Sequence, residues 1–122
     1  MKEVIAIIRP RNIGPMRNAL EQLGFPCMTA TAVLGRGAQR GIAGEVKLSN
    51  PKLRSSSKSG GMKYIPKRLV SIVVQNSDVD TVVKSIVEVN QTLQIGDGKI
   101  FICPLDNAVR IRTNEQGESA VL

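Results

Sequence analysis

Residues 69–90 read LVSIVVQNSDVDTVVKSIVEVN. The run Leu69–Val74 predicts a strand. Valine and isoleucine then recur at helical spacing at positions 79, 82, 83, 86 and 87, which predicts an amphipathic helix that Ser77 or Asp78 can cap. Lys99–Cys103 predicts a second strand. This half of the chain therefore reads as a β-α-β unit.

The N-terminal half repeats the same order. Val4–Ile8 predicts a strand that ends before Pro10, which cannot continue a ladder. Apolar residues at helical spacing follow and predict a helix that stops at Gly24. Cys27–Leu34 then predicts another strand. The apolar residues of the helix are Ile13, Met16, Leu20 and Leu23.

Two such units in tandem predict an α+β fold, the ferredoxin-like β-α-β-β-α-β sandwich, as a single domain over residues 1–122. Two helices cover only one face of a four-stranded sheet. An apolar sheet face has to be covered, so we expect the chain to form oligomers.

A long polar segment, residues 36–63, interrupts this regularity. It contains a serine- and glycine-rich run and no helical or strand periodicity, and a loop of this length in a compact domain is usually functional or disordered. Residues 36–68 hold nine basic residues against one acidic residue, so they carry +8 while the rest of the chain sums to −1. The basic segment is either a docking element or a solvated linker.

The composition argues against most enzyme classes. The chain has no histidine, which excludes Ser-His and Cys-His couples, and its two cysteines, Cys27 and Cys103, are too far apart for a metal box. No acidic pair stands close in sequence on a strand end or helix face as an acid/base couple would, but carboxylates distant in sequence could still meet in space. The apolar runs are too short to span a bilayer and no signal peptide is present, so we expect a cytoplasmic protein without stable membrane insertion.

Two segments together suggest a phosphate site. In Ile95–Phe101, IGDGKIF, two glycines allow backbone N–H groups to approach an anion and Lys99 adds a cation. In Arg110-Ile111-Arg112, strand geometry would place both guanidinium groups on one face, where they suit phosphate oxygens. Taken singly, the first could be a tight turn and the second a solvated strand face.

These residues resemble signature segments of the PII family of nitrogen regulatory proteins. QTLQIGDGKIF at 91–101 closely resembles the family's B-loop (91–99 here), and Arg110–Thr113 resembles its basic C-terminal strand (strand and tail 108–122). Gly35–Gly41, GRGAQRG, is similar to the start of its T-loop, which corresponds to residues 36–63. The resemblance covers nearly the whole chain, apart from about nine extra T-loop residues.

The resemblance implies a trimer that binds ATP or ADP in clefts between subunits. B-loop residues would hold the phosphates beside the basic C-terminal strand, and Thr29 would lie near the adenine. The residues carried over for the phosphates are Gly96, Gly98, Lys99, Arg110 and Arg112.

The resemblance also implies a site for 2-oxoglutarate. Gln39 would help to ligate the Mg²⁺ that bridges ATP and the oxoacid, and Lys67 would pair with the distal carboxylate. Gly37 and Gly41 would supply backbone contacts.

Three positions depart from the family pattern. Leu93 stands where the family usually has glycine, and Ala38 replaces a basic residue, which weakens a phosphate contact. Proteobacterial members are uridylylated on a tyrosine near the T-loop apex, whereas Tyr64, the single tyrosine here, lies at the loop's end.

The lengthened T-loop, Met62–Arg68 and Val89–Thr92 look most like the nitrogenase-associated PII subgroup, second paralogue. This implies a regulator, not an enzyme, that inhibits a nitrogenase component directly, as a homotrimer or with a paralogous subunit. The expected docking residues are Lys47, Lys52, Arg54 and Lys58.

Three alternatives remain. The chain could be a general PII regulator of an ammonium transporter or another enzyme of nitrogen metabolism. A single-stranded nucleic-acid binder is disfavoured because the aromatic residues are too few to form stacking platforms. A small nucleotide hydrolase lacks an evident base or nucleophile.

Overall fold

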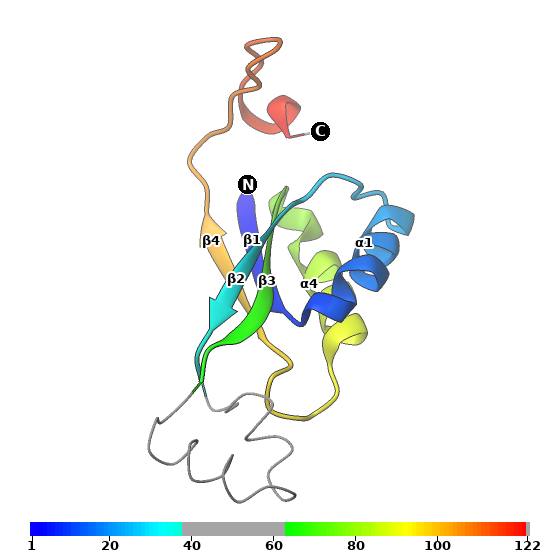
Figure 1. Cartoon of the computed structure of the whole chain (residues 1–122). Helices are drawn as coiled ribbons and strands as arrows, with labels where there is room; N and C mark the ends of the chain where they lie inside the picture. The colour runs from blue at the N-terminus through cyan, green and yellow to red at the C-terminus, as the bar shows by residue number, and fades with distance from the viewer. Residues whose placement is uncertain (38–62, 122) are drawn as a thin grey trace, which may run out of the picture.

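A computed structural model describes residues 1–37 and 63–121 (Figure 1). The main elements are β1 (Lys2–Ile8), α1 (Ile13–Gln22), β2 (Thr29–Gly35), β3 (Ile65–Val74), α4 (Val79–Asn90) and β4 (Lys99–Pro104). Three short 3₁₀ turns accompany them: η1 (Pro10–Asn12), η2 (Asn76–Asp78) and η3 (Gly117–Ala120). The predicted α+β ferredoxin-like order is confirmed. Most of the T-loop segment lies outside the described residues. The predicted site residues that fall there are Gln39, Gly41, Lys47, Lys52, Arg54 and Lys58.

The four strands form one antiparallel sheet in the order β2-β3-β1-β4. Figure 1 shows both helices on one face of this sheet. The register places Ile5 of β1 opposite Ser71 of β3 and Phe101 of β4. Because neighbouring residues of a strand point to opposite faces, this register sorts the side chains into a helix-covered face and an open face.

The core lies between the sheet and the helices. Its buried members are Val4, Ala6, Ile8, Met16, Leu20, Val70, Ile72, Val74, Val82 and Ile86. Each is at most 4% exposed. Full burial of such side chains contributes about 1.5–3 kcal/mol each for the larger ones, which explains why the alternating strands and striped helices adopt this arrangement.

The end of α1 agrees with its predicted stop signal, whereas the start of α4 lacks its predicted cap. After α1, the N–H of Phe25 donates to Leu20 O (2.9 Å) and that of Gly24 to Glu21 O (3.0 Å), with Gly24 at φ +92°. This is a Schellman motif, so the predicted stop at Gly24 is confirmed. Asp78 occupies the N-cap of α4 but makes no side-chain capping bond, so the predicted cap is absent.

The open face of the sheet is largely apolar. By register it carries Ile5 and Ile7 of β1, Leu69 and Val73 of β3, and Phe101 of β4, which is 47% exposed. Glu3 lies among them, and its carboxylate accepts a hydrogen bond from the Ser71 hydroxyl across the β1–β3 pair (2.6 Å). No helix of the described residues covers this face.

Two strand predictions need correction. β3 begins at Ile65, four residues before the predicted start at Leu69, because residues 65–67 pair with β2 alone and so tolerate Pro66. The predicted strand through Arg110–Arg112 is wrong. The chain turns there, closed by Asn114 N–H to Arg110 O (2.7 Å), and the only ladder contact described is the isolated Val109–Gln116 bridge.

Candidate functional site

The B-loop is organised around the carboxylate of Asp97. Asp97 Oδ2 accepts hydrogen bonds from the backbone N–H of Thr92 (2.7 Å) and of Leu93 (2.9 Å), and Oδ1 accepts from the Thr92 hydroxyl. Arg9, at the end of β1, forms an ion pair with the same Oδ1 (2.7 Å) and donates to Ile95 O (3.0 Å). The loop between α4 and β4 is therefore closed onto β1.

These donors hold the pKa of Asp97 well below its usual range. The largest contribution is the hydrogen bond from the Thr92 side chain, followed by that from Arg9 and the backbone N–H groups. A carboxylate whose folded-state pKa is depressed contributes stability above its unfolded pKa, about 3.9. That contribution is lost as the pH falls below this value towards the folded-state pKa.

We predict that Asp97→Asn reduces stability near neutral pH and flattens its acid dependence. The variant loses the charged acceptor, and its amide N–H₂ faces a donor. Between about pH 4 and pH 2 the wild type should lose more unfolding free energy than the variant, as measured by urea unfolding. Asp106→Asn, an exposed change beyond β4, is the control. Parallel pH profiles for wild type and Asp97→Asn would contradict the role of Asp97.

The two B-loop glycines adopt left-handed conformations, with φ +102° at Gly96 and +108° at Gly98. A Cβ at Gly98 would lie 1.9 Å from the carbonyl oxygen of Ile7. The turn thus passes directly against β1, in a space that admits no side chain. Such a backbone cradle, followed by the exposed Lys99, is suited to an anion.

Lys67 connects this turn with the start of β3. Its side chain is buried, with the residue 8% exposed, and its Nζ donates to Gly96 O (2.7 Å). The T-loop ends lie at the same end of the sheet: Gly35 pairs with Ile65, and the Arg36 guanidinium stacks over the Tyr64 ring at 5.8 Å. Gly37 follows directly in a bend.

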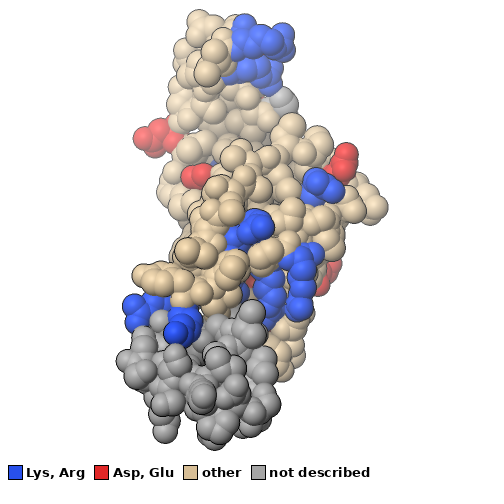
Figure 2. Space-filling model, viewed as in Figure 1, with Lys and Arg blue, Asp and Glu red and all other residues tan. Residues whose placement is uncertain are grey.

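The other predicted nucleotide residues lie at the opposite end of the sheet (Figure 1). Thr29 begins β2 and lines a hollow of about 690 Å³, together with Phe25, Met28 and Ala108. Arg110 holds the C-terminal turn through Glu115 Oε1 (3.1 Å) and Ser119 O (3.1 Å), while Arg112 is exposed on that turn. Figure 2 shows lysine and arginine side chains at both ends of the molecule.

The predicted nucleotide residues therefore form two groups that one chain does not bring together. Gly96, Gly98 and Lys99 precede or begin β4, and Arg110 and Arg112 follow its far end. Sequence reasoning also missed the roles of Arg9, Asp97 and Thr92. The placement of an aspartate between two glycines was the available signal for Asp97, but nothing local indicated Arg9, 88 residues away in the chain.

Leu93 occupies an unusual position for its residue type. Its φ is +68°, in the left-handed region, and the side chain is 83% exposed. A leucine here costs strain that glycine would avoid. The structure thus explains why this position suits glycine, and nothing in the described part of the chain explains the leucine.

The fold, the glycine turn and the basic residues match a known class of regulators. Residues 1–115 match the family described as "Nitrogen regulatory protein P-II". The chain belongs to the PII family. This confirms the resemblance inferred from the B-loop and the C-terminal basic residues.

The relatives identify the subgroup. The chain is 53% identical over 122 residues to "Nitrogen fixation nifHD region GlnB-like protein 2" of Methanobacterium ivanovii, covering 100% of both chains. It is 55% identical to the nifHD1 region GlnB-like protein 2 of Methanosarcina barkeri, covering 99% of each. From Methanothermobacter marburgensis, protein 2 is 54% identical over 99% of this chain and 100% of the relative. Protein 1 from the same organism is only 40% identical over 96% and 99%.

The predicted likeness to the second nitrogenase-associated paralogue is thus confirmed, and the chain is a PII-type nitrogen regulatory protein of the nitrogen-fixation type. None of the helices in residues 1–37 and 63–121 is long and apolar enough to cross a membrane.

Proposed function

We propose that this chain senses ATP or ADP together with 2-oxoglutarate and regulates nitrogen fixation by inhibiting a nitrogenase component through its T-loop. The observation that carries the proposal is the preformed B-loop: Gly98 pressed against Ile7 and Lys67 bonded to Gly96, beside the two T-loop ends. A ligand held at this turn would be sensed directly where the T-loop begins and ends. The similarity to nifHD-region proteins supports the target class.

The nucleotide would lie between two copies of the chain. Gly96, Gly98 and Lys99 of one copy would hold the phosphates, and Arg110 and Arg112 would come from the next. The hollow that contains Thr29 would receive the adenine, since it lies at the same end as the C-terminal turn. The uncovered apolar sheet face supports assembly, as a homotrimer or with a paralogous subunit. ATP or ADP, with Mg²⁺, are the cofactors that we expect.

The oxoacid would compete for a hydrogen-bond donor that the B-loop already uses. The Lys67 ammonium lies 2.7 Å from Gly96 O, so a carboxylate bound by Lys67 would replace or share that carbonyl. Gln39 is the residue that we expect to ligate Mg²⁺, and it lies outside the described residues. Effector and partner would then bias the same loop in opposite directions, and by linkage each would weaken binding of the other.

We expect Lys67→Met to weaken 2-oxoglutarate binding by about 10–100-fold, because a charged hydrogen bond contributes about 1.5–3 kcal/mol. Methionine keeps the buried stem and removes only the charge. Calorimetry with saturating Mg-ATP measures the effect, and Gln39→Ala should act similarly. Lys63→Met, an exposed change two residues before β3, is the matched control. Tight oxoacid binding without nucleotide, or unchanged binding in Lys67→Met, would overturn this site.

Partner inhibition should depend on the T-loop charge. Replacing Lys52, Arg54 and Lys58 together with glutamate should abolish inhibition of nitrogenase and its dependence on ionic strength, while nucleotide binding persists. Exposed charges are screened over about 8–10 Å near physiological salt, so wild-type inhibition should fall as salt rises.

A matched variant separates loop charge from net charge. Replacing Lys2, Arg17 and Lys84 on the sandwich with glutamate changes the net charge equally and should leave inhibition intact. Equal loss in both triple variants would show that only net charge matters. A wild-type chain that left nitrogenase unaffected, and instead bound an ammonium transporter, would favour the general PII alternative.

A further inference from the structure

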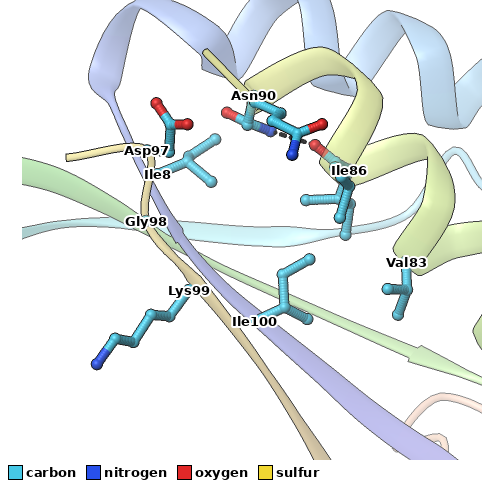
Figure 3. Close-up of a pocket in the computed structure, with 10 residues that line it drawn as sticks. Ile8, Val83, Ile86, Asn90, Asp97, Gly98, Lys99 and Ile100 are labelled. Carbon is cyan, nitrogen blue, oxygen red and sulfur yellow. Dashed lines mark hydrogen bonds between the residues drawn. The ribbon is translucent and has the colours of Figure 1, made fainter. Parts of the chain in front are cut away.

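Two large apolar side chains of the B-loop lie on its outer surface. Leu93 is 83% exposed and Ile95 is 64% exposed. A hollow of about 390 Å³ lies behind the same loop, where Ile86 of α4 faces Ile100 of β4 (Figure 3). Asp97 of the loop lines this hollow, whereas Leu93 and Ile95 do not. We call the exposed pair, Leu93 with Ile95, the B-loop patch.

The backbone at Leu93 is strained. Its φ of +68° lies in the left-handed region, where a Cβ is crowded and where glycine is at no disadvantage. With so little of its side chain covered, Leu93 gains little from burial in its own chain. Backbone strain that persists at a single residue is typical of functional segments. Neither packing within the chain nor backbone preference accounts for a leucine at this position.

The loop holds both side chains of the patch in place. The N–H of Leu93 donates to Asp97 Oδ2 (2.9 Å), and Ile95 O accepts a hydrogen bond from the Arg9 guanidinium (3.0 Å). Asp97 and Arg9 also form an ion pair with each other (2.7 Å). An ordered loop loses little conformational entropy when it docks. The patch therefore resembles the preformed apolar anchors that contribute most of the binding energy in protein interfaces.

The position of the patch indicates the chemistry of its partner. Lys67 joins the B-loop to β3 through Gly96 O (2.7 Å), so the patch lies at the end of the sheet where the T-loop begins and ends. Residues 36–68 carry +8, whereas residues 91–99 contain one aspartate and one lysine and are neutral. A protein that binds the T-loop has an acidic surface by charge complementarity, and the neutral, apolar B-loop patch lies beside that contact.

We propose that the B-loop patch is a second docking surface, which inserts Leu93 and Ile95 into an apolar pocket on the acidic protein that the T-loop binds. This rests on the proposed function in one respect, that the protein bound is a nitrogenase component. The T-loop supplies charge attraction, and the patch supplies apolar contact at fixed positions. The two contributions differ in their response to salt, because ions screen the first and not the second.

Substitutions at Leu93 separate the side chain from the backbone. Leu93→Gly removes the anchor and relieves the strain. It should therefore unfold at the same or a higher urea concentration than the wild type, yet inhibit purified nitrogenase about 10–100-fold less potently, as expected for the loss of one buried leucine. Leu93→Met keeps an apolar side chain on the same backbone and should stay within about threefold of the wild type. Leu23→Ala, a change of an exposed leucine at the C-cap of α1, should leave inhibition unchanged.

Salt dependence and two alternative ligands complete the test. The ratio of wild-type to Leu93→Gly potency should stay constant as salt rises, while both potencies fall. Equal potency of Leu93→Gly and the wild type would overturn the contact. Weaker self-association of Leu93→Gly would place the patch between copies, and loss of binding to phosphatidylglycerol vesicles would make it a membrane contact; either result would also overturn it. A wild-type chain that leaves nitrogenase unaffected would overturn the proposed function, and this contact with it.

Discussion

Replacing Gly98 with alanine is expected to destabilise the chain by roughly 3–5 kcal/mol and to abolish nucleotide binding. The new Cβ would lie 1.9 Å from Ile7 O, so either β1 or the B-loop has to move. The left-handed φ of +108° adds backbone strain of about 1–3 kcal/mol to this overlap. Urea unfolding measures the first effect and calorimetric titration with ATP the second.

Two other glycines provide matched controls for this prediction. Gly14 lies in α1, and a Cβ added there would have nothing within 4 Å, so Gly14→Ala should be neutral or stabilise by up to about 1 kcal/mol. Gly24 has φ +92° but open space around it, so Gly24→Ala should show the strain alone, about 1 kcal/mol. If Gly98→Ala cost no more than Gly24→Ala, the close approach to Ile7 would have no energetic role.

Lys99→Ala and Arg112→Ala should each weaken ATP binding by about 10–100-fold, and mixing the two variants should restore part of it. Lys99 begins β4, whereas Arg112 lies on the turn beyond its far end. Suppose that each site takes Lys99 from one copy and Arg112 from the next. In random assemblies of equal amounts of the two variants, about a quarter of all sites then hold both residues. Arg112 is preferred to Arg110 for this test because Arg110 also holds the turn through Glu115 and Ser119.

The readout is the number of high-affinity sites in co-expressed, differently tagged chains, measured by calorimetric titration. A chain that carries both substitutions should gain nothing when mixed with either single variant, because no arrangement of such copies contains an intact site. Mixed single variants that bind as weakly as either variant alone would show that the two residues do not meet across copies.

Much of the sandwich could be predicted because its elements are locally self-consistent. The stripes of α1 and α4 and the β-branched runs of β1 and β3 each bury one face, and that pattern is visible in consecutive residues. Even so, β3 starts four residues earlier than predicted. Residues 65–67 include a proline and a lysine and lack the pattern, and they are strand only because β2 pairs with them.

The C-terminal segment shows the opposite failure. Val109–Arg112 alternates like a strand, yet a strand exists only where another strand supplies its ladder. In the described residues, Val109 forms a β-bridge only with Gln116. Asn114, at φ +59°, allows the chain to turn where a strand would continue straight. Alternation alone could not distinguish these outcomes.

The fold class, the glycine turn and the concentration of charge in residues 36–68 could be predicted from local periodicity, residue type and composition, which need no partner in space. The family was predicted from the resemblance of the B-loop and C-terminal segments to family motifs. The folded structure was needed to show that Arg9 closes the B-loop onto Asp97, that Lys67 reaches Gly96, and that the two groups of predicted nucleotide residues lie at opposite ends of one chain. Those facts depend on sheet register and strand direction, which bring together or separate residues irrespective of their distance in sequence.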